Sequence, residues 1–432
     1  MSDDTLFDRH APADRSVSDG APRYETANRH QIELVPIDLE GLLPPGHAAR
    51  LVWRFVEGLD LRAFYATIQA REGHAGRAAI DPQILIALWL YATIDGVGSA
   101  REVDRLCYAH DAYRWIRGGV SVNYHTLSDF RVAHEAALDD LLTQSSAVLL
   151  RTGGLTLARV AQDGTRVRAQ ASLKSFRRRP TLEAALRVAR QQVDRTARQG
   201  AAHGARQAAA EARATREHEA RIEAALAELP AVEAAKRRNG SKTAARASTT
   251  DPTARVMRFS DGGFRPGYNI QLASDVDGRA IVGVAVTNVG SDQGELIPML
   301  AQIARRTGRG PEALLADGGF VTKDTVTTIA AAGTTLYAPV MTPKSTRDPG
   351  QPCVGDAPAV AAWRARMATD TAKALYKRRA PAAEGINAEA CVHRTLRGVL
   401  VRGLTKVHSW ALWVALAINV LRAMEIVPHE MT

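Results

Sequence analysis

Two aspartates occupy similar positions at distant points of the chain. Asp163 follows the short apolar run 157–161, and Asp317 follows a second apolar run, 313–316. A strand that ends in a carboxylate places that group at the rim of a sheet, and two such groups side by side can bind Mg²⁺, which prefers oxygen ligands. The two positions therefore predict the core of a metal-dependent phosphoryl-transfer site.

Each aspartate also has a simpler interpretation. Asp163 and Asp317 both precede glycine, and Asp-Gly is a common turn dipeptide. Their shared position at the ends of strands favours the metal-site interpretation over the turn interpretation. A third acid is expected from a neighbouring element, and the last long helical stretch contains Glu384 and Glu389. Taken alone, Glu384 fits a solvated helix residue, and Glu389 remains the alternative third acid.

Composition limits the class of protein. The 432 residues are enough for two or three domains, and the formal net charge of +10 favours polyanionic partners, although it also fits a protein that merely has a high pI. The three cysteines, Cys107, Cys353 and Cys391, form no Cys-x-x-Cys pair, which suits a reducing cytosol. The run 410–424 is interrupted by Asn419 and Arg422, so we expect no membrane span.

The first part of the chain divides into a tail and a helical region. Residues 1–30 are polar and predict a disordered tail. Residues 31–152 predict an all-helical domain, in which Asp81-Pro82 begins one helix, Ser99 caps the next, and a further helix runs from about Thr126 to Leu150. We predict that this domain binds DNA through Asn123, His125 and Arg131, and a purely structural role for these residues is equally open.

After Gly154 the pattern changes to strands. We expect strand 157–161, then a helical hairpin inserted over 180–238, then antiparallel strands around 255–287, and then alternating helices and strands. The composition of 180–238 also fits a lone solvated helix or a structural coiled coil. The order predicts an α/β fold whose mixed sheet carries both aspartates on neighbouring strands.

Several short motifs occur in an order that resembles a known family. From about Pro36 to Met424, the chain is similar to bacterial insertion-sequence transposases of the DDE class, in the broad insertion-sequence-five group. The motifs are Gly76-Arg77, Asp81-Pro82, Gly98-Ser99, Thr126 to Arg131, Ala161 to Thr165, Ala316 to Phe320, Tyr376, Arg379, Glu384, Arg402 to Leu404, Lys406-Val407 and Asn419. Many members have a lysine seven residues after the glutamate, where this chain has Cys391.

The resemblance implies an RNase-H-like catalytic domain over residues 153–432. Asp163, Asp317 and Glu384 would be its catalytic residues and would bind two Mg²⁺ (or Mn²⁺) ions, which would serve to cut transposon ends and join them to target DNA by phosphoryl transfer. The partner would be double-stranded DNA, both transposon ends and target, bound by a homodimer in the bacterial cytoplasm at the nucleoid. The residues that we expect to contact this DNA are Asn123, His125, Arg131, Arg166, Arg168, Lys174, Arg177, Arg178, Arg179, Lys377, Arg379 and Arg394.

Two alternatives share most of these features. A metal-dependent nuclease on the same fold would use the same acids without joining DNA. A catalytically inactive transposase relic would bind DNA and do no chemistry.

Overall fold

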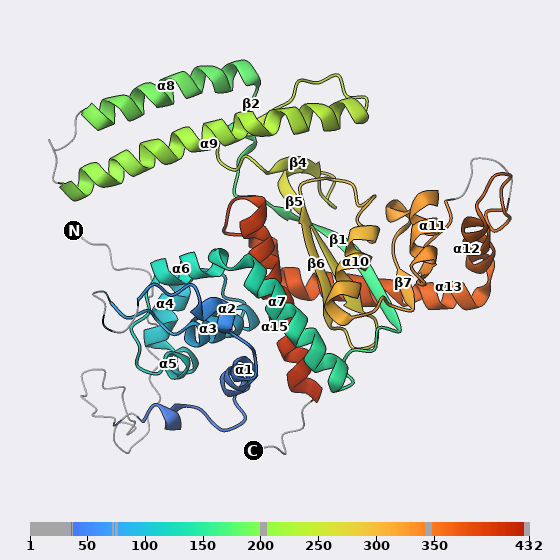
Figure 1. Cartoon of the computed structure of the whole chain (residues 1–432), viewed down its shortest axis with the longest axis horizontal. Helices are drawn as coiled ribbons and strands as arrows, with labels where there is room; N and C mark the ends of the chain where they lie inside the picture. The colour runs from blue at the N-terminus through green and yellow to red at the C-terminus, as the bar shows by residue number, and fades with distance from the viewer. Residues whose placement is uncertain are drawn as a thin grey trace, which may run out of the picture. The chain divides into compact units, whose positions relative to one another are not determined.

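The computed structural model describes residues 36, 38–70, 73, 77–198, 205–341 and 348–426. The tail predicted over 1–30 lies outside the described residues. Residues from Leu39 onward form one compact unit, and Figure 1 shows its helices and strands.

The N-terminal part of this unit is helical, as predicted. Asp81 accepts a hydrogen bond from the backbone of Gln83 at 2.9 Å, and Ser99 accepts one from Glu102 at 3.4 Å, so both predicted helix starts are confirmed. The elements are a 3₁₀ turn η1 (Glu40–Leu42) and the helices α1 (Ala48–Glu57), α2 (Arg62–Tyr65), α3 (Pro82–Ile94), α4 (Ala100–Ala109), α5 (Asp111–Arg117), α6 (Tyr124–Ala133) and α7 (Glu135–Arg151).

The single helix predicted from Thr126 to Leu150 is instead two helices, α6 and α7. The break is at His134, whose backbone leaves the helical region at φ −122° and ψ 43°. The His134 ring packs against the rings of Phe64 and Phe130, with centroids 5.1 Å and 4.9 Å away. The residues on both sides of His134 follow a helical pattern, so the sequence does not show this break. The break depends on a tertiary contact between aromatic rings.

A mixed sheet follows the helices. Its order is β4-β5-β1-β7-β8, with β6 paired to the same edge of β5 as β4. β1 is antiparallel to β5 and parallel to β7, while β7 is parallel to β8. The strands are β1 (Arg159–Arg168), β4 (Arg255–Arg258), β5 (Phe264–Asp275), β6 (Ile281–Thr287), β7 (Ala313–Leu315) and β8 (Thr335–Tyr337), and the connecting helices are α10 (Leu296–Thr307) and α11 (Lys323–Ala331).

Three details of these strands and helices bear on the site. β1 continues seven residues past Ala161, to Arg168, so the predicted strand end at Ala161 is wrong. β5 is buried continuously from Pro266 to Asp275, so both of its faces are covered. α10 begins at Leu296, so Asp292 precedes the helix.

The helical hairpin predicted over 180–238 is confirmed as α8 (Arg179–Arg198) and α9 (Ala205–Arg238), which lie side by side in Figure 1. Leu182 and Ala189 of α8 pack against Ile222, Ala225 and Leu229 of α9 in a separate small core. Two short strands, β2 (Phe176–Arg177) and β3 (Ala247–Ser248), pair at the base of the hairpin. The hairpin is inserted between β1 and the next strand of the main sheet, β4.

The chain ends in a series of helices. These are α12 (Pro358–Ala368), α13 (Asp370–Lys377), α14 (Arg379–Ala388), a π turn η4 (Glu389–His393), a 3₁₀ turn η5 (Leu396–Gly398) and α15 (Leu404–Ile426). Within the described residues, α15 is the one helix long and apolar enough to cross a membrane, yet 72% of its apolar window is buried inside the protein. Asn419 on α15 donates to the Ile281 carbonyl at 2.9 Å and accepts from the Ile281 amide at 2.7 Å, so this helix is fixed to β6.

Candidate active site

Asp163 and Asp317 lie on neighbouring strands. β1 and β7 are parallel with Ala161 opposite Leu315, and each aspartate comes two residues after its member of this pair. The predicted neighbourhood of the two strands is therefore confirmed. β7 ends at Leu315 while β1 continues, so Asp163 stands in the middle of a long strand, at the point where its parallel neighbour ends. This correction still leaves the two carboxylates beside one another.

The two aspartates have different surroundings. The Asp163 side chain is 21% exposed, whereas Asp317 is exposed and caps a 3₁₀ turn, η3 (Gly318–Phe320), by accepting from the Gly318 amide at 2.6 Å. Burial raises the pKa of Asp163, and the Arg379 guanidinium opposes that shift. The negative charges of Asp292 and Asp317 also raise the Asp163 pKa, which indicates that the three carboxylates interact electrostatically.

One face of α14 covers Asp163. Arg379 contacts Asp163 Oδ1 at 3.0 Å, and the Asn387 amide donates to Asp163 Oδ2 at 3.2 Å. Arg379, Ala383 and Asn387 follow at intervals of four residues, so they share one face of the helix. Asn387 was not predicted as a site residue, and this four-residue spacing after Arg379 is the signal that could have identified it.

The two candidate third acids differ in their contacts. Glu384 is exposed on α14, three residues before Asn387, and the two are neighbours on the helix surface. Glu389 is 15% exposed and forms ion pairs with Arg422 at 2.7 Å and Arg394 at 3.4 Å. Within the described parts of the chain, no three carboxylate, imidazole or thiol side chains gather closely enough to hold a metal ion. The structure thus sets Asp163 beside Asp317, while Glu384 as the third acid stays a prediction.

Two further side chains surround Asp163. The pKa of the Tyr376 phenol is raised first by burial and also by the charges of Asp317 and Asp163, while Arg379 opposes the rise. Cys391, at the position where the resembling family has lysine, lies 3.8 Å from the Thr165 hydroxyl. Thr165 is two residues after Asp163 on β1 and faces the same side of the sheet. Position 391 therefore lies on the Asp163 side of the sheet.

The opposite face of β1 holds a second polar cluster. Asp292 accepts hydrogen bonds from Asn269 and Gln271 of β5, each at 2.7 Å, and pairs with Arg166 at 3.3 Å. Gly164 lies against this cluster, and a Cβ there would stand 2.3 Å from Asp292 Oδ1 and 2.4 Å from Gln271 Nε2. The cluster therefore leaves room only for glycine beside Asp163.

Two of the predicted DNA contacts are structural residues instead. Arg131 is 5% exposed, and its guanidinium lies between the rings of Trp89 and Trp410, 4.6 Å and 4.4 Å from their centroids. Arg394 is 17% exposed and donates to the Ile94 carbonyl and to Glu389. The Arg131 guanidinium is therefore buried in the fold, and the Arg394 guanidinium binds groups of the fold while keeping a small exposed area.

The other predicted contacts keep some exposure. Asn123 caps α6 by accepting from the Thr126 amide at 3.0 Å, and Arg379 is engaged by Asp163. Arg166 is 30% exposed and is held by Asp292 and the Gly290 carbonyl. The remaining residues are exposed: His125, Arg168, Lys174, Arg177, Arg178, Arg179 and Lys377.

Comparison with protein families gives two matches, both to transposases. Residues 37–133 match a transposase domain (DUF772), and residues 357–424 match a transposase DDE domain. The first match covers most of the N-terminal helices, and the second covers α12 to α15, including Glu384. These matches support an insertion-sequence DDE transposase, and with it DNA as the partner. No curated protein and no solved structure matches the chain.

Proposed function

We propose that the chain is a DNA transposase that cuts the ends of its element and joins them to target DNA. The observation that carries this proposal is the parallel pairing of β1 and β7, which sets Asp163 beside Asp317 in a chain with two transposase-domain matches. Two ends must be held together for joining, so we also propose a homodimer on DNA, acting at the nucleoid in the bacterial cytoplasm.

The topology supports an RNase-H-like catalytic domain. Three antiparallel strands, β6, β5 and β1, are followed by the parallel strands β7 and β8, with α10 and α11 as crossovers. The long first strand is central and carries the first carboxylate, and its neighbour delivers the second. We propose the insertion-sequence-five group on the motifs around these two aspartates.

The donor set fits a hard divalent cation. Asp163 and Asp317 offer carboxylate oxygens, which Mg²⁺ and Mn²⁺ prefer, and the Asn387 side-chain carbonyl oxygen is buried without a partner among the described residues. Asp163, Asp317 and Glu384 would hold two such ions. When bound, one ion would supply activation of the attacking water and the other stabilisation of the leaving 3′ oxygen.

The chain's own residues position the reaction. Asp163 is fixed by the pairing of β1 with β5, Asp317 by its turn, and Arg379 supplies a positive charge where a scissile phosphate would enter. The freed 3′-hydroxyl then attacks a target phosphodiester, and no covalent protein–DNA intermediate is needed. Glu384 is favoured as the third acid because Glu389 is already engaged by two arginines.

The test is cleavage and joining of DNA that carries the ends of the chain's own element, in the presence of Mg²⁺. We expect Asp163→Asn, Asp317→Asn and Glu384→Gln each to abolish both products, while Glu389→Gln retains cleavage once its folding is verified by circular dichroism. Loss of cleavage in a folded Glu389→Gln, with Glu384→Gln active, would reverse the assignment of the third acid. Cleavage without joining would identify a metal-dependent nuclease. Binding without cleavage would identify a catalytically inactive transposase relic.

A further inference from the structure

We propose that six exposed cations at the base of the α8–α9 hairpin bind the phosphate backbone of duplex DNA. We call this set the basic collar, and it comprises Arg177, Arg178, Arg237, Arg238, Lys242 and Arg246. The identity of the partner as DNA depends on the proposed function, whereas the basic surface itself is inferred from the contacts described below. Of the six, Arg177 and Arg178 were expected from the sequence, and the structure adds the four on the other segment.

The fold brings two separate basic segments together. β2 pairs with β3, with Arg177 opposite Ala247, and the hydroxyls of Ser175 and Ser248 lie 2.7 Å apart. Arg179 at the start of α8 pairs with Glu233 near the end of α9, at 3.4 Å. The end of α9 and the chain after it therefore lie beside the start of α8.

The charge of the collar is uncompensated. Segments 170–180 and 234–250 contain no aspartate or glutamate. None of the six side chains forms an ion pair with another described residue, and all six are exposed. Elsewhere on the hairpin the arginines alternate with acids, as where Arg190 pairs with Glu219 and Glu223.

Helix stability does not explain this arrangement. Cations at the C-terminus of a helix are favourable, which accounts for Arg237 and Arg238 at the end of α9. Arg177 and Arg178 precede the N-terminus of α8, where the helix dipole disfavours positive charge. Five arginines and one lysine at one place oppose folding through mutual repulsion, and a polyanion relieves that repulsion by neutralising them.

The position suits DNA that reacts at Asp163. β1 runs from Asp163 to Arg168, about 17 Å farther along the strand at roughly 3.3 Å per residue, and the chain reaches Lys174 six residues later. A duplex engaged at the aspartates would present its flanking backbone to the collar. Contacts to the backbone carry no base sequence, so we expect the collar to bind any duplex.

The experiment measures binding of the full chain to a fluorescently labelled duplex of arbitrary sequence, by anisotropy, over a range of KCl concentrations. The collar variant is Arg237→Ala, Arg238→Ala and Lys242→Ala combined. The matched control, Arg195→Ala, Arg213→Ala and Arg216→Ala, removes three exposed charges from the same hairpin, near Asp194, Glu211 and Glu217. A third variant, Arg237→Lys with Arg238→Lys, keeps the charge.

We expect the collar variant to lower the slope of log K against log salt by about 0.9 for each lost phosphate contact, up to roughly 3 in all, and the control to lower it by less than about 1. The lysine variant should keep the slope of the parent. Equal slopes for the collar variant and the parent would overturn the proposal. So would a control whose slope falls as much as that of the collar variant, or a parent that binds no duplex.

The two proposals can fail separately. If the parent binds duplex through the collar but cuts no DNA end, the collar proposal stands and the transposase proposal fails. If the parent cuts and joins ends while the collar variant binds duplex as the parent does, the transposase proposal stands and the collar proposal fails. Circular dichroism of each variant checks that the hairpin remains folded.

Discussion

At the residue scale, the glycine after Asp163 is the most constrained position near the site. A Cβ at Gly164 would overlap Asp292 Oδ1 at 2.3 Å and Gln271 Nε2 at 2.4 Å, and both groups are held by further hydrogen bonds. We expect Gly164→Ala to lower the free energy of unfolding by about 1–3 kcal/mol, as overpacking does. Chemical denaturation measures the change.

The second Asp-Gly motif provides the control for this prediction. A Cβ at Gly319 meets no atom within 4 Å. Gly319→Ala should therefore change the unfolding free energy by less than about 0.5 kcal/mol. If both substitutions change the unfolding free energy equally, the cluster around Asp292 accommodates the added methyl group and does not constrain Asp163.

Asn387 gives a second prediction at this scale. Its amide donates to Asp163 Oδ2, so it orients the carboxylate that would hold the cation. Loss of such an orienting partner typically weakens metal affinity about 10–100-fold, and we expect this for Asn387→Ala. Titration with Mn²⁺, followed by the electron paramagnetic resonance signal of the free ion, measures affinity without any DNA.

The matched control is Asn288→Ala, which removes an amide that donates to the Thr253 carbonyl at 2.9 Å. It should bind Mn²⁺ as the parent does. If Asn387→Ala also binds as the parent does, Asn387 has no positioning role. If the parent binds no Mn²⁺, the cation assignment itself is wrong.

The sequence predicted the aspartate pair and the strands that bear it because buried parallel strands are short apolar runs. It did not predict that β1 continues past Asp163, since Gln162 to Arg166 is polar and its partners on β5 lie more than a hundred residues away. The burial of Arg131 depends in the same way on Trp410, which is distant in sequence and reaches it through α15. Local patterns do not contain such contacts.

At the element scale, the α8–α9 hairpin has a core of its own. Leu229 is fully buried between the helices, and its cluster contains residues of the hairpin and its base and none of the main sheet. We expect Leu229→Ala to destabilise the hairpin by about 2–5 kcal/mol, as for other buried leucines. Hydrogen exchange of the α8 and α9 amides should accelerate, while the β1 and β5 amides keep their protection.

Val188 on α8 serves as the control because its side chain is 65% exposed. Val188→Ala should leave hairpin exchange unchanged. If Leu229→Ala accelerates exchange in β1 and β5 to the same extent, the hairpin and the sheet unfold as one unit and the independent core is not supported.

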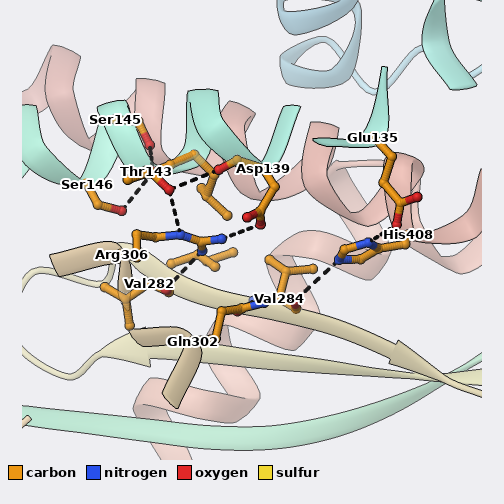
Figure 2. A network of polar contacts seen from close by, with 12 residues as sticks. Glu135, Asp139, Thr143, Ser145, Ser146, Val282, Val284, Gln302, Arg306 and His408 are labelled. Carbon is orange, nitrogen blue, oxygen red and sulfur yellow. Dashed lines mark hydrogen bonds and ion pairs between the residues drawn. The ribbon is translucent and has the colours of Figure 1, made fainter. Parts of the chain in front are cut away.

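At the scale of the whole molecule, the predicted domain boundary after residue 152 is bridged by polar contacts. Figure 2 shows Arg306 of α10 reaching Asp139 and Thr143 of α7, and His408 of α15 between Glu135 and the Val284 carbonyl. One hydrophobic core also contains Trp89 of α3, Trp413 of α15 and Val284 of β6. The helical region and the sheet therefore stabilise one another.

The Arg306–Asp139 pair tests this coupling. The Arg306 side chain is 1% exposed and also donates to the Val282 carbonyl at 3.0 Å; burial lowers its pKa, and Asp139 opposes the shift. Removing one partner of a buried pair leaves an uncompensated charge, so Asp139→Ala should cost about 3–5 kcal/mol of unfolding free energy. Chemical denaturation followed by tryptophan fluorescence measures this loss, since tryptophans lie in the shared core.

Asp140→Ala is the neighbouring control, because the one polar contact of the Asp140 side chain among the described residues is with Gln144 of its own helix, at 3.0 Å. It should change the unfolding free energy by less than about 0.5 kcal/mol. The combined Asp139→Ala and Arg306→Met variant should recover most of the loss, because it removes the buried charge together with its partner. If Asp139→Ala is as stable as Asp140→Ala, the contacts in Figure 2 do not couple the helical region to the sheet.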